Sequence, residues 1–61
     1  MPLVTVKMLE GRTLEQKKAM VEKVTQAIVE TTGAEPDNVL IDIVHMSRED
    51  FARNGKLISE Q

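Results

Sequence analysis

Hydrophobic and polar positions follow two different periods along the chain. From Leu3 to Leu9 the two faces alternate, with Val4, Val6 and Met8 on one of them, which is typical of a half-buried β-strand. From about residue 13 to residue 32 the apolar positions instead recur at spacings of three and four, as in an amphipathic helix. These positions are Met20, Val21, Val24, Ala27 and Ile28. The pattern therefore predicts a strand followed by one long helix.

Residues at both ends of the second segment are typical of helix boundaries. Thr13 and Gln16 have the spacing of a capping box, in which each side chain bonds to the backbone N–H of the other residue. Gly33 suits the left-handed conformation that follows many helices, and Pro36 disfavours continuation. We therefore expect the helix to span roughly Thr13 to Thr32.

A second strand is predicted from Val39 to Met46, where the sequence VLIDIVHM is apolar and rich in β-branched residues. We expect both of its faces to be covered, as in most parallel sheets, with Asp42 as a surface or interface carboxylate. Strand, helix and strand in this order form a βαβ unit with parallel strands and a right-handed crossover. The predicted fold class is α/β, with a single βαβ unit in one domain over residues 1–61.

The last residues predict a turn and a short hairpin. The segment SREDF, from Ser47, is typical of a capped turn or a single helical turn. Asn54 and Gly55 are the strongest short-range hairpin signal, but few strand residues flank them. Because strands this short are not stable alone, we expect the C-terminal hairpin to add to the sheet of another subunit.

Length and composition limit the classes of protein. A chain of 61 residues buries only about 60% of its unfolded surface, so its own core is marginal. The sequence has no cysteine, which excludes disulfides and thiolate ligands, and its one histidine, His45, is expected to be structural and does not predict a metal site. Oligomerisation is the stabilisation that remains, so we expect a homo-oligomer without a metal.

Charge and hydropathy argue against nucleic acid and membrane as partners. The net charge is −2 and Phe51 is the only aromatic residue, so neither a basic patch nor a stacking surface for bases is expected. No apolar run approaches the roughly 20 residues that span a bilayer. The first residues begin a strand and do not form a basic and then apolar leader. These features predict a soluble, cytoplasmic protein.

Pro2 is the first candidate for chemistry. Methionine aminopeptidases remove Met1 when the second residue is small, which would give Pro2 a free secondary amine. An apolar site and a nearby cation such as Arg12 would disfavour the protonated amine, lower its pKa and make it a general base. The alternative is that Pro2 simply begins an edge strand, where a missing N–H costs little. From the residues alone this alternative is favoured, because many proteins begin with Met-Pro.

The sequence resembles the 4-oxalocrotonate tautomerase group of the tautomerase superfamily over nearly its whole length. The resemblance rests on Met-Pro at the start, LEGRT and QK over residues 9–17, a helix that ends near Gly33, and Phe51 before the turn at Asn54 and Gly55. These features are weak individually, but together they are specific on a chain of this length.

The resemblance implies a cofactor-free isomerase. Pro2 would be the general base that moves a proton between carbon and oxygen of an enol or dienol acid. Arg12 would bind a carboxylate of this small-molecule substrate, and Phe51 would belong to an apolar wall that lowers the pKa of Pro2. Members of the group assemble as homohexamers, trimers of dimers, so the resemblance also implies active sites shared between subunits.

One position departs from the pattern of the best-studied members, which carry a second arginine early in the second strand. That arginine polarises the keto oxygen and holds a second carboxylate, whereas Leu40 stands at the matching position and offers the substrate only apolar surface. Arg48 and Arg53 could each replace the cation from a neighbouring chain, although solvated surface charge is the favoured alternative for both. A hydratase, dehalogenase or decarboxylase on the same scaffold, or a non-catalytic oligomer, also stays open.

Overall fold

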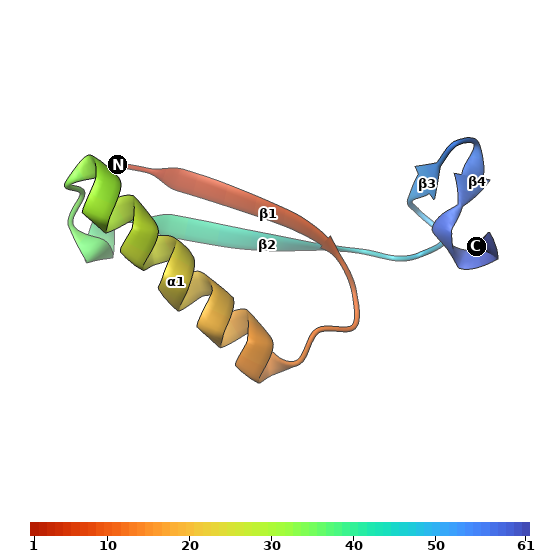
Figure 1. Ribbon diagram of the computed structural model, residues 1–61, viewed down its shortest axis with the longest axis horizontal. Coiled ribbons are helices and arrows are strands. Elements are labelled where there is room, and N and C mark those ends of the chain that lie inside the picture. Colours follow the sequence, from red (N-terminus) through yellow and green to blue (C-terminus); the bar gives the residue numbers. More distant parts are fainter.

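The computed structural model describes all residues, 1–61, and confirms the βαβ unit with a small C-terminal hairpin (Figure 1). Its elements in chain order are strand β1 (Leu3–Leu9), helix α1 (Leu14–Thr32), the 3₁₀ turn η1 (Pro36–Asn38), strand β2 (Leu40–Met46), strand β3 (Ala52–Arg53), strand β4 (Lys56–Leu57) and the 3₁₀ turn η2 (Ile58–Glu60). Neither 3₁₀ turn was predicted. None of the helices has both the length and the apolar character needed to cross a membrane.

Strands β1 and β2 pair in parallel over their full length, as predicted. Leu3 lies opposite Leu40 at one end of the sheet, and Leu9 lies opposite Met46 at the other. Helix α1 runs along one face of this sheet (Figure 1). The side chains that it half-buries on that face alternate along both strands, as expected for this pairing. They are Val4, Val6, Met8, Ile41 and Ile43.

Both predicted ends of the helix are confirmed. Thr13 Oγ1 accepts the backbone N–H of Gln16 at 3.1 Å, and Gln16 Oε1 accepts the backbone N–H of Thr13 at 2.9 Å, which completes the capping box. Gly33 follows the last turn in the left-handed conformation, at φ 77°, and donates its N–H to the carbonyl oxygen of Val29. The direction of the chain before and after α1 is therefore determined by local bonds.

The second face of the β1–β2 sheet, hereafter the open face, has no cover within the chain. The prediction that both faces of the second strand are covered is wrong for a single chain, because its one helix occupies one side only. Leu3 is 70% exposed, Leu40 43% and Val44 38%. Thr5 Oγ1 donates a hydrogen bond of 2.7 Å to Asp42 Oδ1 across this face. No residue is fully buried, so a single chain has no closed core.

Residues 47–61, hereafter the C-terminal arm, extend away from the βαβ unit, and the chain measures 43 × 23 × 14 Å (Figure 1). The predicted turn begins at Ser47, whose Oγ accepts the backbone N–H of Glu49 at 3.2 Å. Asn54 and Gly55 have φ values of 56° and 77°, the left-handed conformations that an Asn-Gly hairpin turn requires. β3 and β4 pair only with each other. Their addition to the sheet of another subunit therefore stays a prediction.

Candidate functional site

Pro2 lies at one end of the sheet, directly before β1. Its carbonyl oxygen accepts a hydrogen bond of 3.0 Å from the backbone N–H of Leu40, which ties Pro2 to the start of β2. Met1 is 84% exposed, so its removal would disturb little packing. With Met1 present the Pro2 nitrogen is an amide, and without Met1 it would be a secondary amine with a basic lone pair. Pro2 is therefore anchored through its carbonyl and not through its nitrogen.

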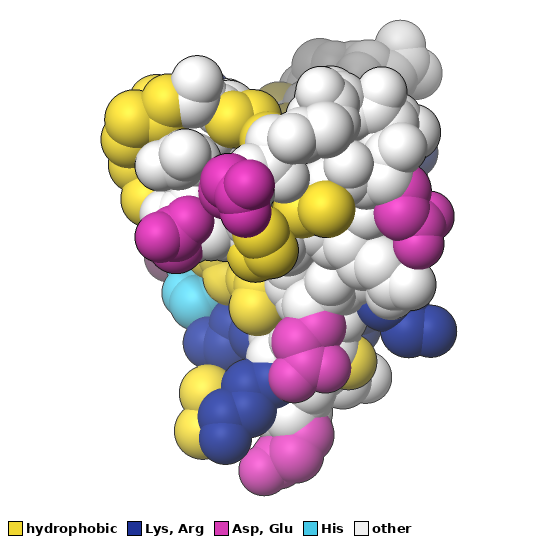
Figure 2. Space-filling view, turned by 90° about the vertical axis from the view of Figure 1, so that its left-hand side faces the viewer, with side chains coloured by type: hydrophobic (Ala, Val, Ile, Leu, Met, Phe, Trp, Pro, Cys, Tyr) yellow, Lys and Arg dark blue, Asp and Glu magenta, His cyan; other side chains and the backbone are white.

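The surroundings of Pro2 on the open face are apolar. Leu3 follows Pro2 in the chain and lies opposite Leu40 in the sheet, and both leucine side chains are exposed. Figure 2 looks onto this end of the molecule, where hydrophobic side chains gather at the upper left. An apolar environment favours a neutral amine over its ammonium form. The structure thus brings together Pro2 and Leu40, two of the six predicted site residues.

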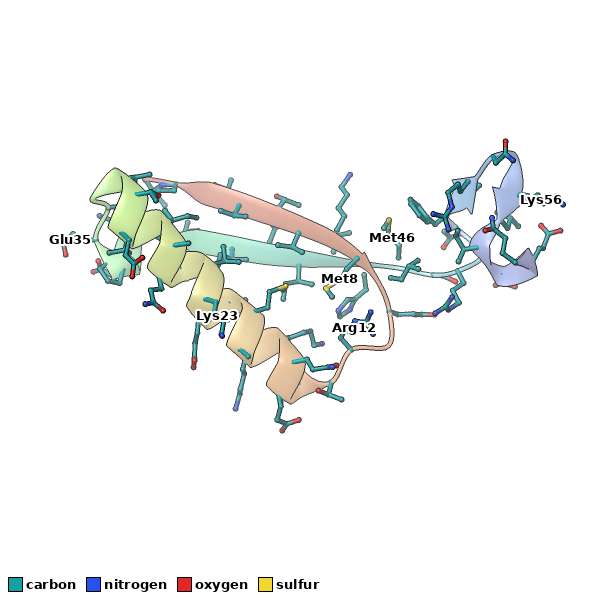
Figure 3. The ribbon with its side chains drawn as sticks, viewed as in Figure 1. Met8, Arg12, Lys23, Glu35, Met46 and Lys56 are labelled. Carbon is teal, nitrogen blue, oxygen red and sulfur yellow. The ribbon has the colours of Figure 1, made fainter.

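Arg12 lies at the opposite end of β1, in the loop that leads into α1. It lines a hollow of about 250 Å³, hereafter the Arg12 hollow, together with Met8, Gln16, Lys17 and Met20. Figure 3 shows Arg12 beside Met8, between the end of β1 and the first turns of α1. A guanidinium and an ammonium next to two thioether side chains suit a carboxylate that is joined to an apolar chain. This hollow is the candidate carboxylate site.

The chain does not bring Pro2 and Arg12 together. Strand β1 separates them, and its seven residues rise about 3.3 Å each, so the two residues lie more than roughly 20 Å apart. A small-molecule ligand cannot contact both in one chain. Any site that uses both residues must therefore combine the Pro2 end of one copy with the Arg12 end of another.

The other three predicted residues lie on the C-terminal arm. Phe51 is 41% exposed, and its carbonyl oxygen accepts the N–H of Ile58 at 2.8 Å. The carbonyl oxygen of Arg48 accepts the N–H of Ser59 at 3.1 Å. Arg53 is in β3. The arm and the N-terminus lie at opposite ends of the molecule, so these side chains cannot reach Pro2 of their own chain (Figure 1).

Arg53 lines a second hollow, hereafter the hairpin hollow, together with Asn54, Lys56 and Gln61. None of these four side chains is acidic or apolar. Gln61 Nε2 donates hydrogen bonds to the carbonyl oxygens of Arg53 and Lys56, at 3.3 Å and 3.2 Å. Figure 3 places Lys56 at the outer end of the arm. Arg48 does not line this hollow, so the structure distinguishes the two arginines proposed as substitute cations.

Sequence reasoning missed the partners of both arginines. Gln16 and Met20 follow Arg12 at intervals of four residues, a helical spacing that could have indicated the face they share. Lys56 could have been paired with Arg53, because a two-residue Asn-Gly loop places its flanking residues opposite each other. Side-chain geometry thus adds a second cation to each hollow.

The remaining polar candidates form no separate site. His45 lies opposite Met8 in the sheet. Asp42 is engaged with Thr5 on the open face. The histidine and acidic side chains include no group of three or more that could hold a metal ion.

The chain as a whole is similar to known proteins in sequence and in fold. The family model described as "Tautomerase enzyme" matches residues 2–61. A 2-hydroxymuconate tautomerase of Bacillus subtilis (strain 168) is 53% identical over 60 residues, which cover 98% of this chain and 97% of that protein. The crystal structure of YwhB, a homologue of 4-oxalocrotonate tautomerase, superposes with a TM-score of 0.94 at 52% identity and covers 98% of both chains.

A more distant structure is informative about assembly. A heterohexamer 4-oxalocrotonate tautomerase from Chloroflexus aurantiacus J-10-fl has a chain that superposes with a TM-score of 0.92 at 25% identity, covering 98% of this chain and 97% of that one. A chain of this fold thus occurs in a heterohexamer.

Proposed function

Because this chain belongs to the tautomerase family and is therefore an isomerase, we propose that it interconverts the enol or dienol and keto forms of 2-hydroxydienoates and related 2-oxo acids. The amine of Pro2 is the general base, and no cofactor takes part. The observation that carries this proposal is the position of Pro2, which is anchored through its carbonyl, lies beside two leucines and is capped only by an exposed Met1. Membership of an enzyme family argues against the non-catalytic alternative.

The active site is assembled from several copies. Pro2 and Leu40 of one chain face the Arg12 hollow and the Phe51 side chain of others, because these groups lie at opposite ends of a single chain. The uncovered open face and the detached arm supply the contact surfaces. We expect a homohexamer built as a trimer of dimers, which the heterohexameric assembly of the Chloroflexus enzyme supports by analogy.

The reaction is a proton transfer between two atoms of the substrate. The Pro2 nitrogen takes the hydroxyl proton of the dienol, the oxygen becomes a carbonyl, and the conjugated double bonds shift along the chain. The protonated Pro2 then returns the proton to a carbon atom, which completes the isomerisation without an oxidant or a reductant. One group acts first as the base and then as the acid, so its pKa must lie near neutrality.

Arg12 and Phe51 support this transfer in different ways. The Arg12 guanidinium donates a bidentate pair of hydrogen bonds to the substrate carboxylate and stabilises the negative charge that develops towards the dienolate. Phe51 of a neighbouring copy adds to the apolar surface of Leu3 and Leu40 and keeps water from the Pro2 amine. Exclusion of water disfavours the ammonium form, which lowers the pKa of Pro2.

The experiment that tests the proposal compares two forms of the chain that differ only at the Pro2 nitrogen. One form begins at Pro2, as verified by intact mass, and the other carries one extra N-terminal residue that converts this nitrogen to an amide. Both are assayed for enol–keto conversion of 2-hydroxymuconate and phenylenolpyruvate. We expect the blocked form to lose about 10²- to 10⁴-fold in kcat, the usual contribution of a general base.

The control is the oligomeric state, which light scattering should show to be the same for both forms. Pro2→Ala provides a graded intermediate, because alanine leaves a primary amine at the same place. Full activity in a form with a verified blocked nitrogen would reject Pro2 as the base.

A further inference from the structure

The two cations of the hairpin hollow lie on the same face of the hairpin as Phe51. Arg53 and Lys56 are directly opposite each other in the β3–β4 ladder, and opposite residues share a face. Phe51 precedes Arg53 by two residues, the spacing that returns a side chain to the same side of an extended chain. Ala52 and Leu57 form the next pair and occupy the other face. The hairpin therefore has one cationic and aromatic face and one apolar face.

The two faces of the hairpin suit different contacts, one with another copy and one with an anion. Leu57 is 37% exposed in the single chain, so the apolar face still has surface that can pack on another copy. The opposite face presents a guanidinium, an ammonium and a phenyl ring, and none of the four residues that line the hairpin hollow is acidic. This combination suits an anion attached to a planar, conjugated chain, because the cations bind the charge and the ring contacts the flat carbon skeleton.

The Pro2 end of the candidate site lacks such a group, because the other pair of cations, Arg12 and Lys17, lies in the Arg12 hollow. Arg12 can hold one carboxylate, and Leu40, next to Pro2, has no donor for another. A carboxylate that loses its water without finding a partner is strongly disfavoured. A dicarboxylate would therefore need a second cationic group from elsewhere in the assembly.

We infer that Arg53 and Lys56 bind the second carboxylate of a dicarboxylate substrate, from the arm of a copy that neighbours the Pro2 in use. This inference rests on the proposed function and adds to it the residues that favour a diacid over a monoacid. The hydrogen bonds from Gln61 Nε2 to the carbonyl oxygens of both residues link the two strands of the hairpin. Arg48 is outside the hollow and serves as the matched control, because it is an arginine of the same arm.

The test measures kcat/KM for 2-hydroxymuconate, a diacid, and for 2-hydroxypenta-2,4-dienoate, a monoacid with the same diene. We expect Arg53→Ala to lower the value for the diacid by about tenfold to a hundredfold, mainly through KM, as expected when a charge-assisted hydrogen bond is lost. The value for the monoacid should change less than about twofold. Lys56→Ala should show the same selectivity with a smaller loss, and Arg48→Ala should leave the ratio of the two substrates unchanged.

A second variant separates substrate binding from a structural role of the hairpin. Arginine at position 40 would place a cation beside Pro2, so Leu40→Arg should restore diacid turnover in the Arg53→Ala background. Equal losses for diacid and monoacid in Arg53→Ala, or the same loss in Arg48→Ala, would overturn the inference.

Failure of the proposed function can be recognised independently. If the chain that begins at Pro2 isomerises neither substrate, the function is wrong, and the hairpin hollow is then judged by calorimetry with two inert acids. The assembled protein should bind hexanedioate more tightly than hexanoate, and Arg53→Ala should abolish the difference. Equal binding of the two acids by the unmodified protein would overturn the inference.

Discussion

The βαβ unit and the C-terminal arm differ in what holds them together. The βαβ unit has a full parallel ladder, a helix capped at both ends and one covered sheet face. The arm has two strands of two residues each, a left-handed turn and a few backbone hydrogen bonds. Bonds within the chain thus specify the βαβ unit almost completely, whereas the arm leaves Phe51 and Leu57 partly exposed.

The same division applies to the candidate site. Pro2 and Leu40 at one end of the βαβ unit are joined by a backbone hydrogen bond, while Phe51 and Arg53 lie on the arm at the far end of the molecule. The candidate site residues of this small protein therefore lie at both ends of the chain and do not surround a single cavity. Substitutions in the βαβ unit should mainly alter the oligomeric state or the kinetic constants of the reaction. Substitutions in the arm should mainly alter how the substrate and the Pro2 amine are surrounded.

The largest effect is expected from a charge on the open face. Val44→Lys would place an ammonium in a surface that we expect other copies to cover, and an unpaired buried charge costs about 3–5 kcal/mol. The variant should lose both assembly and activity, as measured by light scattering and by the enol–keto assay. Ala19→Lys, which adds the same group to an exposed position of α1, is the control. An unchanged oligomeric state in Val44→Lys would show that the open face is not an interface.

A smaller effect is expected at the Arg12 hollow. Arg12→Ala removes the partner of the substrate carboxylate, so KM should rise by about tenfold to a hundredfold, with a lower kcat if the guanidinium also stabilises the dienolate. The kinetic constants of Lys23→Ala, which removes an exposed cation from α1, should stay within about twofold. An equal effect of the two substitutions would mean that the Arg12 hollow is not the carboxylate site.

The smallest of these three effects is expected from Phe51 on the arm. Phe51→Ala would admit water to the Pro2 amine, which stabilises the ammonium form and raises the pKa of the amine. The active form is the neutral amine, so the rise of activity with pH should move to higher pH while the oligomeric state is kept. The pH profile of kcat/KM measures this shift. A profile identical to that of the unmodified protein would place Phe51 outside the site.

The βαβ unit could be predicted from the sequence because its determinants are local. The alternation around Val4 and Val6, the capping box at Thr13 and the glycine at position 33 each define a strand or a helix boundary without help from distant residues. As a sequence signal, Pro36 only disfavours continuation of the helix. In the structure it begins a 3₁₀ turn, because proline fits the first position of a helical turn as readily as it ends the previous helix.

The arrangement of the site was less accessible to sequence reasoning. The residues alone suggest Arg12 as a cation near Pro2, although a strand of seven residues separates the two within one chain. The cover predicted for both faces of the second strand failed for a related reason. Apolar residues such as Leu40 and Val44 indicate burial, but they do not indicate whether the covering surface belongs to the same chain.

The separation of Pro2 from Arg12 along β1 has a genetic consequence. A chain with a defective Pro2 still carries an intact Arg12, and a chain with a defective Arg12 still carries an intact Pro2. When two such mutant alleles are expressed together, the proposed shared site implies that mixed assemblies contain some sites in which both intact residues meet. Two loss-of-function alleles of this gene should therefore complement each other, whereas two alleles altered at the same end of the strand should not.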